Sequence, residues 1–343
     1  MRDAMRRLTL SCDSGLANRM RVLVSGRVIA RAAGAELEFL WPLHTTCGAA
    51  FERLFEASPD VRTVTFEAVR GLPAPPRQWG ALPPDLLADP REHVTLAYVS
   101  WLLRPATFPA HAALWPELAP GLAALVPTAS LRERVAAFQS AHFRPFMIGV
   151  HLRRGDFHLA RPDVIANTDA VIARIGEHIV AHPDAGILLA TDDGAVDGEG
   201  QPVAEGVRGE LRRRFGERVV SAPLRSLDRN APEAIEDALV ELLLLRQTHA
   251  VIGTRASSFS ELAAFGRDVP FDCPEGTPER WRRLEHLARR TGAYLHIMRA
   301  AQRFLGHEPD TFFQGWRAMR HAIGASRAVM TVRELTGIKR RQR

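Results

Sequence analysis

Short apolar runs of strand length alternate with longer helical patterns along most of this chain. Strands are expected at residues 8–12, 35–41, 94–98, 146–152, 185–190, 218–221 and 250–253. Helices are expected at residues 16–33, 130–140, 168–182, 203–215, 233–248 and 257–265. A strand followed by a helix and another strand builds a parallel sheet with helices on its faces. The alternation therefore predicts an α/β protein of the doubly wound type.

The 343 residues suffice for two such units, since one domain takes about 100–200 residues. The pattern restarts near residue 143, so we expect a Rossmann-like domain on the acceptor side over 1–142 and a second, ligand-binding one over 143–277. Residues 278–343 are helical in pattern and basic, and we expect them to form a C-terminal helical extension. Residues 57–93 are poorly patterned, and the proline-rich stretch 72–84 is expected to be a surface loop.

Lysine is almost absent: Lys339 is the only one among 45 basic residues. A phosphate-binding Walker A loop needs a lysine after glycine, and a protein kinase needs one on a strand. Both classes are excluded. Any anion that this protein binds must be held by arginine or by backbone N–H groups.

The three cysteines, Cys12, Cys47 and Cys273, are far apart and form no Cys-x-x-Cys pair. This spacing argues against a zinc ribbon and a disulfide scaffold, and it suits a reducing compartment. The N-terminal apolar stretch is shorter than the roughly 7–15 residues of a secretory signal. No run approaches the roughly 18 apolar residues of a membrane span. We therefore expect a soluble, cytoplasmic protein.

The strongest local signal lies where the strand over 146–152 ends, in the segment His151-Leu-Arg153-Arg154-Gly-Asp156. The two-residue period of a strand places His151 and Arg153 on one face and Arg154 on the other. Arginine presents a planar fork of donors that matches a phosphate group. The segment therefore predicts an anion site, and the plainer alternative is an Arg–Asp ion pair that closes the strand.

Two further acidic signals follow. Asp192 and Asp193 stand at the end of the strand over 185–190, where they could bind a ligand hydroxyl, an arginine or a metal ion, or cap the next helix. We rank the metal role lower because no further ligands accompany the pair. Glu241 interrupts an apolar helix. It is either buried with a partner or placed on a solvent stripe beside Asp237, and the pattern does not decide between the two.

Small and hydroxyl residues open two of the expected helices. Ser257 and Ser258 follow the strand over 250–253, where serine hydroxyls and free N–H groups can bind an anion or simply cap the helix. Gly15 allows a close backbone approach before the first long helix, and Asn18 and Arg19 lie in that helix's first turn. Histidines show no metal-ligand spacing, and we expect no metal site.

Together these segments resemble the fucosyltransferase superfamily that includes α1,2-, α1,6- and protein O-fucosyltransferases. Residues 151–156 are similar to its His-x-Arg-Arg-x-Asp motif, and residues 189–193 to its second motif. The Glu241 helix, residues 251–254 and Ser257-Ser258-Phe259 are similar to its third, with one extra residue before the serine pair. Gly15-Leu-Ala-Asn18 is similar to the family's Gly-x-Gly-Asn loop, with an alanine as the second glycine.

The resemblance implies a GT-B-like fold of two Rossmann-like domains, with the donor held mainly by the second and no cofactor. It implies an inverting transfer of fucose from GDP-fucose without a metal ion. By position, Arg153 would contact the diphosphate, and Arg153 and Glu241 are the expected catalytic residues. The base for the acceptor hydroxyl is left open between Glu241 and a residue of the first domain such as Asp13 or His44. Asp192 or Asp193 would contact guanosine or order the arginines. The expected donor-binding residues are Gly15, Asn18, His151, Arg153, Arg154, Asp156, Asp192, Asp193, Ser257, Ser258 and Phe259.

We therefore expect a glycosyltransferase that moves fucose, or a close sugar, from a GDP-sugar to a glycan or glycolipid. Two alternatives remain: a nucleotide-sugar-binding protein without turnover, and a metal-dependent transferase that uses Asp192 and Asp193. A nucleic-acid partner is not expected, because no basic–aromatic motif accompanies the pI near 10.1. Residues 278–343 hold 15 basic and 5 acidic residues. They either pack on the donor domain or make peripheral contact with an anionic inner membrane.

Overall fold

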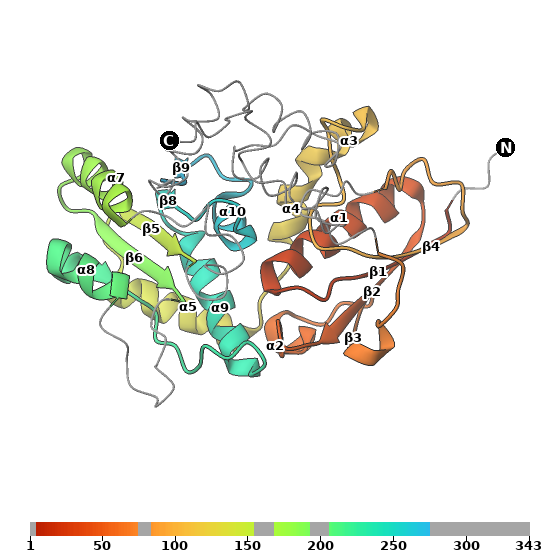
Figure 1. Ribbon diagram of the computed structural model, residues 1–343, viewed down its shortest axis with the longest axis horizontal. Helices are drawn as coiled ribbons and strands as arrows, with labels where there is room; N and C mark the ends of the chain where they lie inside the picture. The colour runs from red at the N-terminus through yellow and green to blue at the C-terminus, as the bar shows by residue number, and fades with distance from the viewer. Residues whose placement is uncertain (1–4, 75–83, 154–167, 193–205, 275–343) are drawn as a thin grey trace, which may run out of the picture. The chain divides into compact units, whose positions relative to one another are not determined.

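The computed structural model describes residues 5–74, 84–153, 168–192 and 206–274 (Figure 1). These residues lie in one compact unit, which by its contacts comprises residues 1–75, 82–160 and 165–275. The expected C-terminal extension over 278–343 lies outside the described residues. Two parallel sheets form the framework, so the prediction of an α/β protein with two Rossmann-like sheets is confirmed.

The first sheet has the strand order β3-β2-β1-β4, with every pairing parallel. Its strands are β1 (Arg7–Ser11), β2 (Glu36–Leu43), β3 (Val61–Thr65) and β4 (His93–Ala97). Helix α1 (Leu16–Ala33) connects β1 to β2 and ends at Gly34, which adopts a left-handed conformation with φ of 65°. Glycine accepts this φ without steric cost, so it stops the helix where the sequence predicted.

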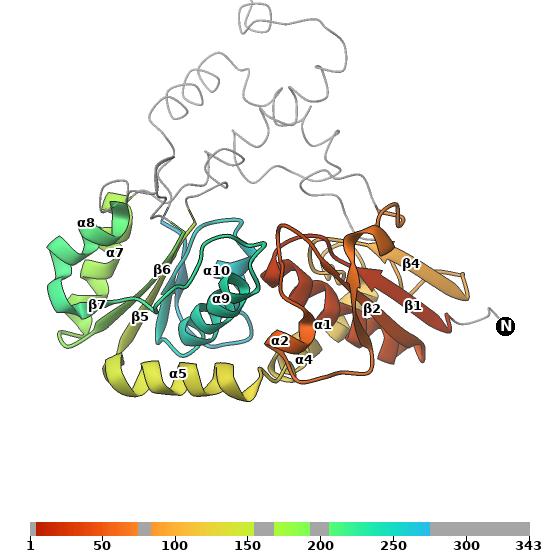
Figure 2. The same ribbon diagram turned by 90° about the horizontal axis from the view of Figure 1, so that it is seen from below.

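The second sheet has the order β7-β6-β5-β8-β9, again parallel throughout. Its strands are β5 (Met147–Leu152), β6 (Gly186–Thr191), β7 (Val219–Val220), β8 (Ala250–Ile252) and β9 (Phe271–Asp272). The connecting helices are α7 (Thr168–Ala181), α8 (Gly206–Phe215), α9 (Pro232–Leu245) and α10 (Ser258–Ala264). Every residue of β5 and β6 is buried, because helices cover both faces of the sheet (Figure 2).

The remaining helices of the described chain are α2 (Phe51–Leu54), η1 (Phe66–Ala68), α3 (Pro109–Leu114), η2 (Trp115–Glu117), α4 (Leu118–Ala123), α5 (Ala129–His142) and η3 (Gly216–Arg218). Helix α5 packs on α9, while α1 packs on both α4 and α10. Contacts between α1 and α10 therefore join the first sheet's long helix to the last helix of the second sheet.

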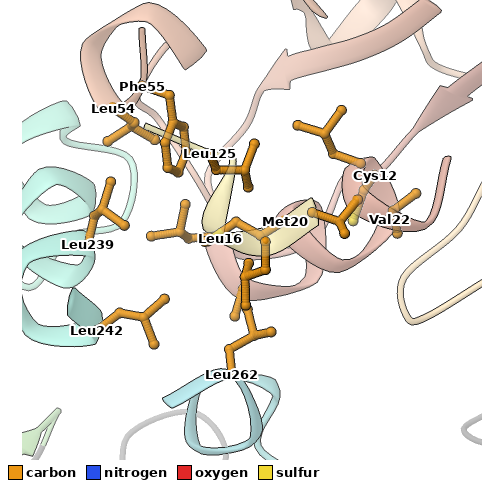
Figure 3. Packing of buried hydrophobic residues seen from close by; sticks show 14 of the residues in the cluster. Cys12, Leu16, Met20, Val22, Leu54, Phe55, Leu125, Leu239, Leu242 and Leu262 are labelled. Atoms are coloured by element: carbon orange, nitrogen blue, oxygen red, sulfur yellow. The ribbon is translucent and has the colours of Figure 1, made fainter. Parts of the chain in front are cut away.

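Alternation along β5 assigns its side chains to two cores. Ile148, Val150 and Leu152 face α7 and α8 in a small cluster. Met147 belongs to a larger cluster that contains residues around both sheets. Figure 3 shows part of this larger cluster, in which Leu16 and Met20 of α1 lie among side chains from α9 and α10 (Leu239, Leu242 and Leu262). The larger cluster therefore packs against both sheets, and the smaller one packs against the second sheet only.

Strand β3 is the main element that the sequence pattern missed. It lies within the stretch 57–93, and three of its five residues (Arg62, Thr63 and Thr65) are polar. As the edge of the first sheet, it has one paired neighbour and needs little apolar surface. Strand β9, also at an edge, has only two residues and was likewise not expected.

Candidate functional site

β5 and β8 are neighbours in the second sheet, but the chain continues from them in opposite directions. The next strand after β5 is β6, on one side of the pair, and the next strand after β8 is β9, on the other side. Ligands of open α/β sheets bind at such a switch point, outside the carboxyl ends of the strands. Arg153 directly follows β5, and Thr254 lies two residues beyond β8. The backbone N–H of Arg153 donates to Thr254 Oγ1 at 2.9 Å, and that hydroxyl donates to the His151 carbonyl at 3.2 Å. Thr254 therefore fixes the backbone from which the Arg153 side chain starts.

The third strand at this edge supplies an acid to Arg153. Asp192 directly follows β6, and its Oδ2 lies 3.6 Å from Arg153 Nε. Both side chains keep about a fifth of their surface exposed (23% and 22%). Thr191 donates to the Leu152 carbonyl at 2.8 Å, which ties the ends of β6 and β5 together. The structure thus brings Arg153 and Asp192 together, while Arg154, Asp156 and Asp193 lie outside the described residues.

His151 is buried beneath this edge and points toward α10. Its Nδ1 lies 2.6 Å from Ser260 Oγ, and its ring faces Phe259 at 4.6 Å between centroids. Burial lowers the pKa of His151 to about 4, with Asp192 opposing the shift and Arg153 adding to it. The imidazole is therefore neutral at pH 7 and shares a hydrogen bond with Ser260. Through its contacts with Ser260 and Phe259, His151 joins α10 to the end of β5.

The turn from β8 into α10 gives the two candidate serines different environments. Ser257 is the N-cap: it is buried, and its Oγ accepts from the Ser260 N–H at 3.5 Å, a long contact for a hydrogen bond. Ser258, the first helical residue, is half-buried, and its hydroxyl is not needed for the cap. Ala256, before the cap, has φ of 56° in the left-handed region. The extra residue before the serine pair is therefore accommodated by a strained backbone conformation at Ala256.

A glycine allows this turn to lie close to the sheet. A Cβ on Gly253 would lie 2.6 Å from the Ser260 Cβ and 2.8 Å from the Phe271 ring. Both distances are shorter than any side-chain contact allows, so strand and helix approach closely only because residue 253 is glycine. This close approach lets Ser260 Oγ accept from the Thr254 N–H at 3.0 Å.

Glu241 lies buried on α9, so the interpretation that it occupies a solvent stripe beside Asp237 is wrong. Asp237 is buried as well. Burial alone would raise its pKa, but hydrogen bonds from Arg225 and Arg134 hold it below its usual range. Glu241 has no such hydrogen-bonded cation, and its Oε1 is buried without a hydrogen-bond partner among the described residues.

Burial accordingly raises the pKa of Glu241 to about 8. The charges of Asp237 and Asp192 add to this rise, and that of Arg208 opposes it. The charge of Asp192 therefore acts on Glu241 as well as on Arg153. At pH 7 its carboxyl group is mostly protonated and can donate a hydrogen bond.

The loop before α1 uses its polar side chains internally. Asn18 donates to Ser14 Oγ at 2.8 Å and accepts from Arg21 Nη2 at 2.7 Å. Gly15 caps the helix with φ of −65°, and a Cβ there would meet its nearest neighbour, the Thr46 carbonyl oxygen, at 3.8 Å. Neither the backbone nor the described neighbours require glycine at this position.

Sequence reasoning missed three residues that join this loop to α10. Arg21 Nη1 lies 2.5 Å from Glu261 Oε2, and the Trp101 indole Nε1 donates to Glu261 Oε1 at 2.6 Å. The Arg21 guanidinium also lies over the Trp101 ring, 5.8 Å from its centroid. An arginine on the otherwise buried face of α1 was the signal that could have found this contact, because a buried charge needs a partner.

The described ranges contain no group of three or more His, Cys, Asp or Glu side chains placed to hold a metal ion. Within the same ranges, no helix has the length and apolar character needed to cross a membrane.

Comparisons with known proteins give matches among solved structures. No family model matches the sequence, and no curated protein matches it. The NodZ α-1,6-fucosyltransferase soaked with GDP-fucose is 20% identical, with 76% of this chain and 91% of that chain covered and a TM-score of 0.47. The fucosyltransferase NodZ from Bradyrhizobium is 18% identical (77% and 94% covered, TM-score 0.49). POFUT1 in complex with GDP is 15% identical (79% and 99% covered, TM-score 0.46).

Proposed function

We propose that this protein is an inverting, metal-independent glycosyltransferase that moves fucose, or a close sugar, from a GDP-sugar to a glycan or glycolipid. The observation that carries the proposal is the placement of Arg153 at the switch point of the second sheet. Its backbone is held by Thr254 and its guanidinium is paired with Asp192. The motifs at residues 151–156, 189–193 and 251–259 support GDP-fucose as the donor.

The chemistry of such a transfer explains why arginine is needed. As the bond from the sugar to the diphosphate breaks, the sugar becomes cationic and negative charge grows on the departing GDP. A fixed guanidinium aimed at that charge stabilises the transition state more than the ground state. Asp192 would hold the Arg153 guanidinium in place. Ser258 would add a hydroxyl to the same diphosphate, since the capping role belongs to Ser257.

Glu241 is the second proposed catalytic residue, and its raised pKa defines what it can do. An inverting transfer needs a base that takes the proton of the acceptor hydroxyl. With a pKa of about 8, Glu241 is half ionised near pH 8 and mostly neutral at pH 6. As the base it would therefore give a rate that rises with pH through this range. In its neutral form it would serve as a hydrogen-bond donor to the bound GDP-sugar.

The proposal is tested by thermal shift with GDP, UDP and ADP, followed by release of GDP from GDP-fucose with candidate acceptors. We expect selective stabilisation by GDP and turnover that survives a chelator. Turnover lost with the chelator and restored by a divalent cation would favour the alternative that uses Asp192 and Asp193. GDP binding without turnover would favour a nucleotide-sugar-binding protein. No stabilisation by any nucleotide would overturn the proposal.

We also propose that residues 278–343, with 15 basic and 5 acidic residues, contact an anionic membrane where lipid-linked glycan acceptors lie. Each arginine near such a surface contributes about 1 kcal/mol of attraction. The test is co-sedimentation of the full chain, and of a chain ending at Gly324, with anionic and neutral vesicles at low and high salt. Salt-sensitive binding to anionic vesicles alone, reduced by the truncation, supports the contact. Recovery in the supernatant with both vesicle types contradicts it.

A further inference from the structure

Glu261 lies on the first turn of α10. Each of its carboxylate oxygens accepts a hydrogen bond, one from Arg21 of α1 and the other from Trp101. Arg21 holds Oε2 at 2.5 Å, and the Trp101 indole donates to Oε1 at 2.6 Å. The glutamate side chain is 41% exposed, whereas that of Arg21 is 10% exposed. The pair therefore places a nearly buried cation against a half-exposed acid.

Burial of the Arg21 guanidinium costs free energy, which its hydrogen-bond partners must offset. Burial lowers the pKa of Arg21, and the negative charge of Glu261 is the strongest influence that opposes this shift. Its other amino group, Nη2, donates to Asn18 Oδ1 at 2.7 Å, and its guanidinium lies over the Trp101 ring. A guanidinium with two planar hydrogen-bonding edges can hold two partners at once in a fixed relative position.

These contacts link two segments of the proposed site. On one side, Asn18 is bonded to both Arg21 and Ser14, in the loop that opens α1. On the other, Glu261 closes the first turn of α10, where its N–H donates to the Ser257 carbonyl at 3.0 Å. Four side chains, those of Ser14, Asn18, Arg21 and Glu261, thus connect the start of α1 to the serine turn.

We propose that Arg21 and Glu261 are positioning residues that hold the loop over residues 14–18 in register with the serine turn of α10. This inference rests on the proposed function, in which the serine turn binds the donor diphosphate and Gly15 and Asn18 belong to the donor site. Neither residue touches the donor in this scheme. Their effect on the reaction is to fix the segment that carries Gly15 and Asn18 relative to the serine turn.

Such a role makes a specific kinetic demand. Misplacing bound reactants by about 1 Å can lower a rate on the order of 10²-fold while leaving the binding of either partner nearly intact. Breaking the pair should therefore reduce kcat far more than it weakens GDP binding. A purely structural ion pair would instead lower the melting temperature and leave kcat unchanged at temperatures where the protein is folded.

The test compares Glu261→Gln with Glu117→Gln in the full chain. Glu117 pairs with Arg31, which lies at the other end of α1, so its variant removes an Arg–Glu pair from the same helix far from the serine turn. Trp101→Phe is the second variant, since it removes the indole donor and keeps a smaller aromatic ring beside Phe265. Each is measured for kcat, KM, GDP affinity and melting temperature.

We expect Glu261→Gln to lower kcat at least 10-fold while GDP affinity changes less than about 3-fold. Trp101→Phe should lower kcat more weakly. Glu117→Gln should have the kcat and GDP affinity of the parent. Amide exchange over residues 14–21 gives a readout without turnover: GDP should protect these amides in the parent and in Glu117→Gln, but not in Glu261→Gln. An active parent with an unchanged kcat in Glu261→Gln overturns the inference alone. A parent that neither binds GDP nor transfers sugar overturns the proposed function.

Discussion

The Nδ1 of His151 lies 2.6 Å from the Oγ of Ser260, and the same oxygen accepts the backbone N–H of Thr254 at 3.0 Å. One hydroxyl on α10 therefore serves the ends of both β5 and β8. A hydroxyl has one hydrogen and two lone pairs, so Ser260 can accept from Thr254 and also share a hydrogen bond with Nδ1 of the neutral His151 ring, whose tautomer sets the direction. The first and third sequence motifs are thus joined by one buried oxygen.

The Ser260 hydroxyl should accordingly stabilise the folded chain. We expect Ser260→Ala to lower the free energy of unfolding by about 1–3 kcal/mol, because two buried groups lose their partner at once. Ser130→Ala, in the first turn of α5, is the control with an exposed hydroxyl. Urea unfolding at pH 7 measures both variants. A Ser260→Ala loss no larger than the control's would contradict the hydrogen bonding described.

His151 also sets a pH dependence of stability. Its pKa of about 4 in the folded chain lies below the usual 6.5, so the unfolded chain binds the proton more tightly. Its contribution to stability is therefore fully present above pH 6.5 and is lost as the pH falls from 6.5 toward 4. We expect His151→Gln to show a shallower loss of unfolding free energy than the parent between pH 6.5 and 4.5. Parallel curves would contradict the buried neutral ring.

Arg153→Ala should abolish most of the transfer without unfolding the protein. A phosphate contact that is strongest in the transition state is worth on the order of 10²–10³ in rate. Arg153→Lys should recover little, since lysine lacks the planar fork. Arg62→Ala, which removes an exposed arginine on β3, is the matched control. Near-parental kcat in Arg153→Ala, with an intact melting temperature, would refute the role.

The two serines before α10 should respond differently to the same substitution. Ser257→Ala removes the N-cap and should cost about 0.5–2 kcal/mol of stability with GDP affinity little changed. Ser258→Ala leaves the cap in place and should weaken GDP binding with stability little changed. The measurement is urea unfolding together with calorimetric titration of GDP. Equal effects of the two variants on GDP affinity would show that the cap and the phosphate contact are not separated.

The raised pKa of Glu241 should make the free energy of unfolding depend on pH in the direction opposite to that caused by His151. Its carboxyl holds a proton in the folded chain up to about pH 8, whereas an unfolded glutamic acid releases it near its ordinary pKa of 4.5. The stability that it contributes is therefore present below pH 4.5 and is lost as the pH rises toward 8. Glu241→Gln should flatten this decline between pH 5 and 8, and the exposed Glu210→Gln should not. The comparison uses urea unfolding at each pH.

Local signals in the sequence decided how much of this could be predicted. The helix Leu16–Ala33 was predicted to the residue because Gly34 supplies a left-handed stop that depends on no distant contact. The burial of Glu241 was not decided, because a helix pattern does not tell which of two faces meets another helix. The pair Arg21–Glu261 joins residues 240 positions apart, so no spacing in the sequence could reveal it.

The same limit applied to the turn after β8, where the pattern suggested an extra residue without showing how the chain accommodates it. Ala256, with φ of 56°, gives the answer. A left-handed conformation costs an L-residue roughly 1–2 kcal/mol, and glycine avoids that cost but loses about 0.5–1 kcal/mol of chain entropy. The balance favours glycine at this position.

We therefore expect Ala256→Gly to stabilise the protein by up to about 1 kcal/mol, measured as an increase in the free energy of unfolding in urea. Ala136→Gly, on an exposed position of α5, is the matched control and should destabilise the protein by about 1 kcal/mol, because glycine weakens a helix interior. The two substitutions are chemically identical, so opposite signs can come only from the backbone conformation at each site. A loss of stability in Ala256→Gly comparable to that of the control would show that residue 256 carries no strain, and the extra residue of this turn would then need another explanation.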